Sequence, residues 1–254
     1  MILDVLGASG GELQGHRTTS FLVDGVLAVD AGALTASLPL EALLRIDDVV
    51  LTHSHLDHVK DVPLLADLLV GNRERPLRVH ASRGCVATLR ESLFNGRLWP
   101  DFTRIPGPDR PILELHPFET STPFEVGRYR IEPVPVSHTV ETVGLVVSDG
   151  RAAFAVSGDT GPTAAFWERV NGTHGLGALL VETSFPNALQ WLADVSGHLT
   201  PRTLEQELRK LPRRTAPVWL YHLKPAHQAA LERELHSLGL DGVRILSAGD
   251  RLQL

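Results

Sequence analysis

The sequence predicts an α/β protein in which two stacked β-sheets are covered by helices on their outer faces. Strand-like runs recur from one end of the chain to the other, and helical patterns alternate with only some of them. The two halves also share a plan, because each begins with antiparallel-looking hairpins and continues with alternating strands and helices. No segment rich in Pro, Gly or Ser separates the halves, so we expect a single domain over residues 1–254.

The expected strands are short runs of aliphatic and β-branched residues. In chain order they are Ile2 to Leu6, Ser20 to Leu22, Leu27 to Val29, Asp48 to Leu51, Leu77 to His80, Arg130 to Val136, Val143 to Val147, Ala153 to Val156, Ala178 to Val181, Val218 to Tyr221 and Val243 to Leu246. Phe21 to Asp30 and Val143 to Val156 are expected to form hairpins, the second around an Asp149-Gly150 turn.

Helices are expected where apolar residues recur at helical spacing. The segments are Val62 to Val70, Val86 to Leu93, Ala164 to Val170, Leu204 to Leu211 and Ala229 to Leu238. The least regular segment runs from Asn95 to Pro111 and contains four prolines. We expect a surface loop there, and a cap over a cleft is the alternative.

Composition and charge restrict the class of protein. Hydrophobic residues make up 43% of the chain and charged residues 21%, which is ordinary for a globular protein. The net charge of −6 argues against a nucleic-acid partner, because proteins that bind polyanions usually carry a basic surface. The densest basic cluster, at the expected end of a helix where cations complement the helix dipole, consists of Arg209, Lys210, Arg213 and Arg214.

The sequence indicates neither a membrane segment nor a disulfide. No apolar stretch approaches the roughly 18 residues of a membrane span, and Met1 to Leu6 is typical of a first strand rather than a signal peptide. We therefore expect a cytoplasmic protein without a membrane partner. Cys85 is the only cysteine, which excludes an intrachain disulfide and a cysteine-based zinc site, and we expect it in the core.

Three imidazoles and a carboxylate lie within six positions, directly after a strand-like run. The segment is His53-Ser54-His55-Leu56-Asp57-His58. Imidazole and carboxylate are the usual ligands of zinc and similar divalent ions. The first two histidines have the spacing to share one ion, and the aspartate and third histidine can reach a second ion beside it. A solvated polar turn is the alternative interpretation.

Polar residues further along the chain complete a two-metal site. His138, Asp159 and His222 each follow the carboxyl end of a strand-like run, where sheet-based folds place their chemistry, and His198 lies in a separate loop. A lone histidine is more often structural, so these assignments depend on the first cluster. Asp30 is expected to orient a ligand histidine or the adjoining loop, with a simple turn aspartate as the alternative.

The order of these residues resembles the signature of the metallo-β-lactamase superfamily, His-x-His-x-Asp-His followed by a separate His, Asp and His. The matching residues are His53, His55, Asp57, His58, His138, Asp159 and His222. The resemblance implies an αββα sandwich, in which two mixed β-sheets lie face to face with helices on both outer faces and a dinuclear metal site lies at one edge.

A narrower resemblance is to the class II 3′,5′-cyclic nucleotide phosphodiesterases. The shared segments lie at 6–11, 19–22, 157–161, 182–187, 196–200 and 222–225. The related tRNA 3′-end endonucleases, of the tRNase Z type, have a Glu and a His placed like Glu182 and His198. This chain lacks their long tRNA-binding arm and their positive charge. True zinc β-lactamases commonly carry Cys in place of Asp159 and are usually secreted, so they are set aside.

The resemblance also implies roles for individual residues. One ion would be held by His53, His55 and His138, the other by Asp57, His58 and His222, and Asp159 would bridge both. The ions are expected to be zinc, with manganese or iron as alternatives, and to share a hydroxide that attacks phosphorus. His198 would protonate the leaving ribose oxygen, and Glu182 would orient the His198 imidazole. Asp57 would accept a proton from the nucleophile.

Two further residues are expected to lie near the ligands or the substrate. They are Thr160, next to Asp159, and Lys224, which either neutralises phosphate or is an ordinary surface lysine. The segment from Gly7 to Gly11 lacks the spacing of a nucleotide-binding loop, so we expect a tight loop beside the metal site.

The sequence thus predicts a metal-dependent phosphodiesterase that hydrolyses cyclic AMP or cyclic GMP to nucleoside 5′-monophosphates. The alternatives are a tRNA 3′-processing or other phosphodiesterase, a glyoxalase II- or lactonase-type metallohydrolase, and a binding module that kept the fold without turnover. The expected partner is a small phosphodiester substrate. A homodimer is compatible with the sequence.

Overall fold

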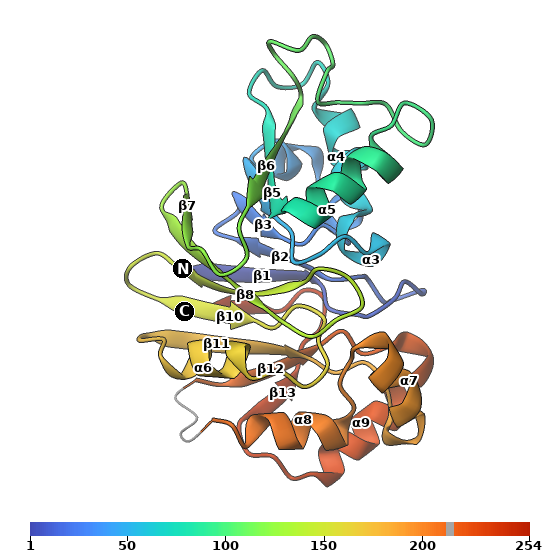
Figure 1. Ribbon diagram of the computed structural model, residues 1–254, viewed down its shortest axis with the longest axis vertical. Coiled ribbons are helices and arrows are strands. Elements are labelled where there is room, and N and C mark those ends of the chain that lie inside the picture. Colours follow the sequence, from blue (N-terminus) through green and yellow to red (C-terminus); the bar gives the residue numbers. More distant parts are fainter. Residues whose placement is uncertain (212–215) are drawn as a thin grey trace.

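Two seven-stranded β-sheets lie face to face in the computed structural model, which describes residues 1–211 and 216–254 (Figure 1). Arg213 and Arg214 of the basic cluster lie outside the described residues. The first sheet has the order β14-β1-β2-β3-β4-β5-β6. Its strands are β1 (Ile2–Gly7), β2 (Ser20–Val23), β3 (Leu27–Val29), β4 (Asp48–Val50), β5 (Leu77–Ser82), β6 (Leu113–Phe118) and β14 (Arg251–Gln253).

The second sheet has the order β13-β12-β11-β10-β9-β8-β7. Its strands are β7 (Phe124–Val126), β8 (Tyr129–Pro135), β9 (Val143–Ser148), β10 (Ala153–Val156), β11 (Leu176–Glu182), β12 (Val218–Tyr221) and β13 (Val243–Ile245). Both sheets are mixed. The pairs from β14 to β3 and from β7 to β10 are antiparallel, and the pairs from β3 to β6 and from β10 to β13 are parallel. The two halves therefore repeat the same arrangement, in which antiparallel strand pairs are followed by parallel ones.

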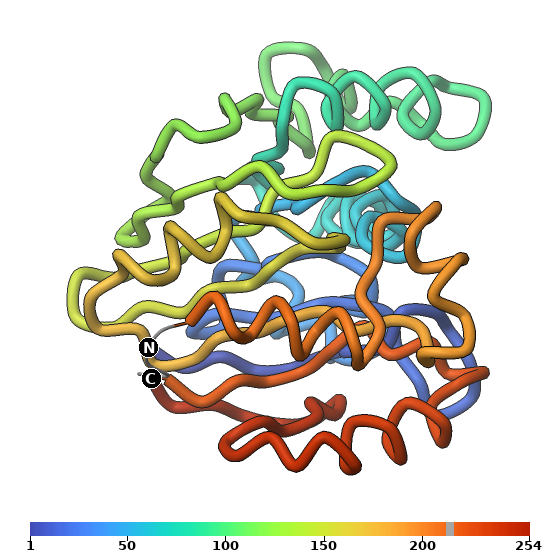
Figure 2. The backbone as a smooth tube through the Cα atoms, turned by 60° about the horizontal axis from the view of Figure 1, so that its bottom comes forward, coloured from blue at the N-terminus to red at the C-terminus, as the bar shows by residue number. Residues whose placement is uncertain are grey.

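Helices cover the outer face of each sheet. In the first half they are α1 (Leu34–Ser37), α2 (Leu40–Leu43), α3 (Leu56–Val59), α4 (Asp61–Leu69), α5 (Arg83–Thr88) and the π-helical turn Leu89–Leu93. In the second half they are α6 (Ala165–Asn171), α7 (Gln190–Ser196), α8 (Pro201–Leu208) and α9 (Gln228–Ser237), with 3-10 turns at Asn187–Leu189 and Pro225–His227. The layers are visible in Figures 1 and 2, where the two chain ends also lie side by side.

Three apolar cores correspond to the three interfaces of this four-layer sandwich. One lies between the sheets and includes Phe21, Phe154 and Tyr221. The other two lie under the helices, around Leu65 in the first half and Phe166 in the second. Each outer core forms because the helical segments expected from apolar spacing turn their buried face to a sheet. The predicted fold class is confirmed.

Several short elements were not predicted from the sequence, and each lacks a clear apolar pattern. β7 and β14 have only three residues each, and the apolar residues of β6 are interrupted by Glu114, His116 and Pro117. In α7 only Ala193 is buried, while Trp191 and Val195 on the same helix are exposed. Packing against neighbouring elements stabilises them, and their own sequences carry no regular apolar pattern that would predict them.

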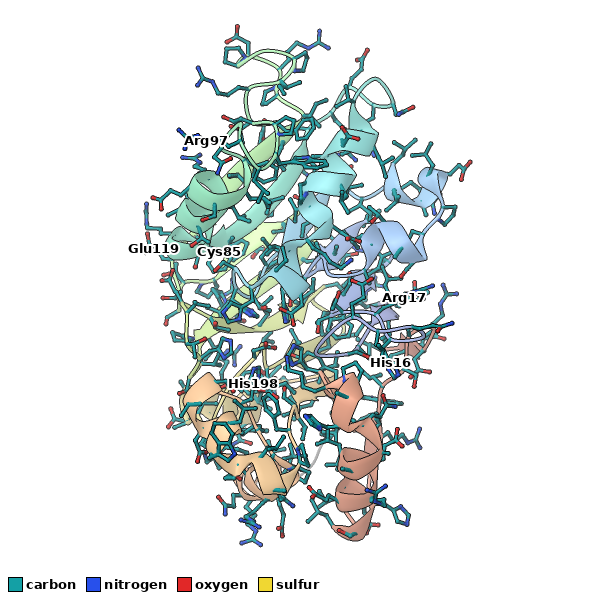
Figure 3. The ribbon with its side chains drawn as sticks, turned by 90° about the vertical axis from the view of Figure 1, so that its right-hand side faces the viewer. His16, Arg17, Cys85, Arg97, Glu119 and His198 are labelled. Atoms are coloured by element: carbon teal, nitrogen blue, oxygen red, sulfur yellow. The ribbon has the colours of Figure 1, made fainter. Side chains whose placement is uncertain are left out.

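The proline-rich segment from Asn95 to Pro111 packs on the outer core of the first half. Phe102 is buried there, and Trp99 and Ile105 contact the same core. Arg97 of this segment is well separated from His198 in Figure 3. The segment thus covers the helical layer of the first half, as expected of an ordered surface loop. No helix within residues 1–211 and 216–254 is long and apolar enough to cross a bilayer.

We expect Gly158→Ala to destabilise the fold more than Gly127→Ala. Both glycines have positive φ, +62° and +56°, so each alanine should cost about 1 kcal/mol for a left-handed backbone. A Cβ at Gly158 would lie 2.5 Å from Val143 O, whereas a Cβ at Gly127 meets no described atom within 4 Å. This clash should add about 1 to 3 kcal/mol in urea unfolding of the metal-free proteins. Equal losses would contradict the close approach at Gly158.

Candidate metal centre

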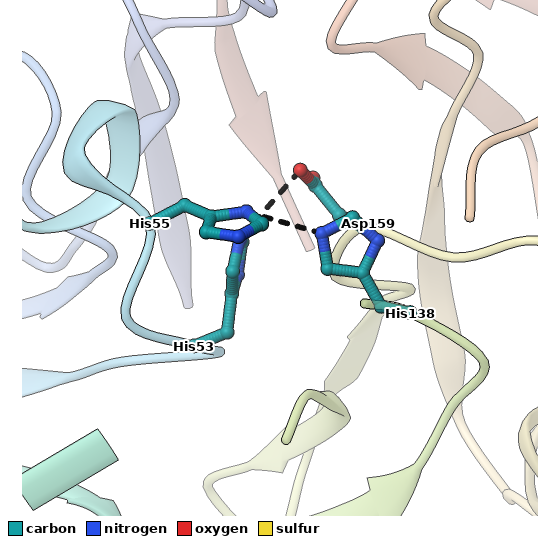
Figure 4. Close-up of side chains that lie close together, drawn as sticks. All are labelled: His53, His55, His138 and Asp159. Carbon is teal, nitrogen blue, oxygen red and sulfur yellow. Dashed lines mark hydrogen bonds and ion pairs between the residues drawn. The ribbon is translucent and has the colours of Figure 1, made fainter. Parts of the chain in front are cut away.

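The seven expected ligands converge where the carboxyl ends of strands from both sheets meet. Potential ligand atoms of His53, His55, His138 and Asp159 all lie within 4.8 Å of one another, and Figure 4 shows these four side chains pointing at a common space. Asp57, His58 and His222 form a second such group. A third contains Asp159, His198 and His222, so His198 lies at the border of the ligand cluster.

The local backbone explains how one short segment serves both groups. His53 and His55 lie in the extended chain after β4, and His55 is the residue before α3, with φ −64° and ψ 147°. Asp57 and His58 then fall in the first turn of α3. The change from extended to helical backbone directs the second pair away from the first. The other ligands follow β8, β10 and β12.

Four of the expected ligand histidines have a partner on the ring nitrogen that faces away from the cluster. The Nδ1 atoms have the following partners: Thr52 Oγ1 at 3.0 Å for His53, Asp30 Oδ2 at 2.7 Å for His58, Gly197 O at 2.9 Å for His138 and Ser184 Oγ at 2.9 Å for His222. Each partner leaves Nε2 directed at the cluster. Such outer contacts fix the tautomer and the ring orientation of metal-binding histidines.

The inner atoms fit divalent cations. Asp159 Oδ1 and His53 Nε2 are buried and have no hydrogen-bond partner among the described residues. Nitrogen atoms also face each other, at 3.3 Å between His58 Nε2 and His222 Nε2 and at 3.1 Å between His55 Nδ1 and His138 Nε2. Lone pairs in this arrangement repel unless a proton or a cation lies between them. Nitrogen and oxygen donors in these numbers are typical of zinc, manganese or iron sites.

The charges of the cluster are strongly coupled. Burial raises the pKa of Asp159, but the neighbouring His222 and His58 outweigh it and hold that pKa well below its usual value. Burial lowers the pKa of His58, yet Asp159 and Asp30 raise it well above its ordinary value. Burial and the nearby His58 hold the pKa of His53 far below the usual histidine range. These interactions favour the ionised form of the Asp159 carboxylate.

Asp30 and His222 have strained backbones, with φ of +56° and +66°. Left-handed conformations are costly for residues other than glycine and persist where the surroundings enforce them. Asp30 is fully buried, and its Oδ1 accepts Thr52 N at 2.8 Å while its Oδ2 contacts His58 Nδ1. The structure thus places Asp30 against His58, one of the expected ligands.

Glu182 and His198 form a buried pair beside the ligands. Glu182 Oε1 lies 2.8 Å from His198 Nδ1 and accepts Thr160 N at 3.0 Å. Burial lowers the pKa of His198, but the charge of Glu182 and its hydrogen bond outweigh this effect and raise that pKa above the ordinary value. The His198 ring stacks on His222, with centroids 5.4 Å apart and planes at 20°.

The Gly7 to Gly11 loop packs against the segment that carries His222, as the sequence predicted. A Cβ at Gly10 would lie 2.4 Å from His222 O, so glycine allows this approach. Lys224 Nζ donates to Gly10 O at 2.5 Å and lies 5.9 Å from the centre of the Phe185 ring. Lys224 therefore ties the loop to the segment after β12, and its contact with phosphate stays a prediction.

Sequence reasoning did not single out Thr52, Ser184 and Gly197 as partners of the ligands. Thr52 directly precedes His53, so its position in the chain was the available signal, whereas Gly197 contacts His138 across 59 positions. Ser184 belongs to the shared segment 182–187, but its contact with His222 joins residues 38 positions apart. Only the packing of the segments after β11 and β12 reveals that contact.

Several known proteins are similar to this chain in sequence or in structure. The chain is 28% identical over 236 residues to the probable 3′,5′-cyclic-nucleotide phosphodiesterase of Yersinia pestis, a match that covers 82% of this chain and 66% of that protein, just under two thirds of its length. Among solved structures, unliganded yeast PDE1 matches with a TM-score of 0.82 and 20% identity over 100% of this chain and 99% of that one. The short form of human tRNase Z matches with a TM-score of 0.68 and 16% identity, over 100% and 99% of the two chains.

The two structural likenesses show a shared fold. The model of a family described as "Beta-lactamase superfamily domain" matches residues 19–222, which include all seven expected ligands. The family expected from the His-x-His-x-Asp-His signature is therefore confirmed. The chain belongs to the beta-lactamase superfamily.

Proposed function

We propose that this metallohydrolase is a phosphodiesterase that hydrolyses 3′,5′-cyclic nucleotides to nucleoside 5′-monophosphates. The hydrogen-bonded Glu182–His198 pair beside the ligand cluster carries the proposal. A ribose oxygen is a poor leaving group until it is protonated, whereas the thiolate expelled by a thioesterase needs little help. The relative from Yersinia pestis, named as a probable cyclic-nucleotide phosphodiesterase, supports the same substrate class.

Two divalent ions, which we propose to be zinc, would be held by the two ligand groups, with Asp159 between them. Asp159 Oδ2 lies 3.7 Å from His53 Nε2 and 3.3 Å from His222 Nε2, so one carboxylate faces both groups. When bound, such ions supply Lewis acidity toward a phosphoryl oxygen and a water-derived nucleophile at neutral pH.

His198 is placed to protonate the leaving oxygen. Its Nδ1 is occupied by Glu182 Oε1, so Nε2 is the atom left to donate a proton. Glu182 is fully buried and orients the imidazole, as a carboxylate partner does in other acid–base pairs. Asp57 has a side chain that is 26% exposed, against 2% for Asp159, and we propose that it accepts the proton of the attacking water.

The proposal is tested with purified, zinc-loaded protein and a panel of substrates. Cyclic AMP and cyclic GMP should yield nucleoside 5′-monophosphates, and bis(p-nitrophenyl) phosphate should be hydrolysed as well. A thioester, a lactone and a precursor tRNA serve as comparisons. Turnover should disappear after chelation and return on addition of zinc, manganese or iron. Hydrolysis of the thioester or lactone without turnover of any phosphodiester would overturn the proposal.

The role of His198 predicts a dependence on the leaving group. His198→Ala should lower turnover of cyclic AMP by about 10²-fold or more, the usual contribution of a general acid. Turnover of bis(p-nitrophenyl) phosphate should fall much less, because p-nitrophenolate leaves without protonation. Both ions should remain bound in metal analysis of the variant.

His236→Ala is the matched control, since it removes an exposed imidazole on α9 outside the ligand groups. Its turnover of both substrates should equal that of the wild type. Equal losses on the two substrates in His198→Ala would refute the acid role.

A further inference from the structure

Ser184 lies at the junction between the ligand cluster and the Glu182–His198 pair. Its side chain is fully buried. Its backbone is held on both sides, because Ser184 N donates to Leu199 O at 2.9 Å and Lys224 N donates to Ser184 O at 3.2 Å. The hydroxyl therefore has a fixed position between the segments that follow β11, α7 and β12.

Four polar atoms surround this one hydroxyl. Ser184 Oγ lies 2.9 Å from His222 Nδ1, 3.0 Å from Glu182 Oε2, 3.2 Å from His198 Nδ1 and 3.2 Å from His222 O. A serine hydroxyl has one proton to donate and two lone pairs that accept. The four contacts cannot all be donations, so the protons of the neighbours decide the direction of each hydrogen bond.

The direction follows from the ligand role of His222. Its Nε2 faces the cluster, 3.3 Å from Asp57 Oδ2 and 3.3 Å from Asp159 Oδ2, so the ring proton belongs on Nδ1. Nδ1–H then donates to Ser184 Oγ. The hydroxyl proton goes to Glu182 Oε2, the nearer of its two acceptors.

We propose that Ser184 is a positioning residue that couples metal binding by His222 to the Glu182–His198 pair. A continuous series of hydrogen bonds runs from His222 through Ser184 and Glu182 to His198. The near-parallel stacking of the two imidazoles lets a single hydroxyl approach both Nδ1 atoms. The contact between Ser184 and His222 follows from the geometry alone. Its effect on proton donation by His198 rests on the proposed function.

Glu182 is anchored independently of Ser184. Its Oε1 accepts Thr160 N at 3.0 Å and Leu199 N at 3.3 Å, besides the contact with His198. Loss of the Ser184 hydroxyl should therefore break the link and leave the carboxylate in place. Because coupling between two groups is reciprocal, a change at Glu182 should alter the affinity for the ion held by His222 more strongly when Ser184 is present than when it is absent.

A double-mutant cycle on metal binding tests the coupling. Metal-free wild type, Ser184→Ala, Glu182→Gln and the double variant are titrated with Zn²⁺ by calorimetry. Ser184→Ala should weaken one of the two binding steps about 10-fold, as expected for loss of a ligand's outer partner, and leave the other within about 2-fold. Glu182→Gln should weaken the same step in the wild type and have a smaller effect in Ser184→Ala.

Thr183→Ala is the matched control, because this neighbouring buried hydroxyl donates only to the main-chain carbonyl of Glu182 at 2.7 Å. Both binding steps should be unchanged in it. Ser184→Gly, which also lacks the hydroxyl, replaces Ser184→Ala if the alanine variant does not fold, as judged by circular dichroism of the metal-free protein.

Equal weakening of both steps, or the same effect of Glu182→Gln in both backgrounds, would overturn the proposal. The titration uses the metal alone, so its outcome does not depend on phosphodiester turnover. Absence of turnover on cyclic nucleotides would refute the proposed function and leave the coupling intact.

Discussion

The arrangement of this site depends on one buried carboxylate, that of Asp159, held among imidazoles where the two sheets meet. Its side chain is 2% exposed, and its oxygens face His53, His58 and His222 at 3.3 to 3.7 Å. Burial of a charge is costly unless compensating charges surround it. The histidines supply part of that compensation, and divalent cations would supply the rest. The glycine at 158, with its left-handed backbone, lets the chain bring this carboxylate to the junction.

The surrounding structure keeps the imidazoles in one orientation around that carboxylate. Asp30 and Ser184 each contact the outer nitrogen of an expected ligand histidine. Asp30 follows β3, and Ser184 follows β11. The strained backbones of Asp30 and His222 show that the packing enforces these positions. The same network reaches the Glu182–His198 pair, so ligand orientation and the proposed proton donor share one set of hydrogen bonds.

Much of the fold and the ligand set could be read from the sequence because their signals are local. Four ligands lie within six residues from His53 to His58, and most strands are contiguous apolar runs. The partners of the ligands could not be found in this way. Ser184 and His222 meet because β11 and β12 pair in parallel. Only one residue of α7 is buried, and Gly197, which follows this helix, contacts His138 through its carbonyl oxygen. Such features follow from tertiary packing, which local periodicity does not encode.

The most direct measurement is anomalous X-ray diffraction from crystals of the zinc-loaded protein, recorded above and below the zinc absorption edge. The ligand geometry predicts two anomalous peaks, one among His53, His55 and His138 and the other among Asp57, His58 and His222, with Asp159 in contact with both. A single peak, or a peak held by His198 in place of the Asp57 group, would contradict the assignment of the two metal sites.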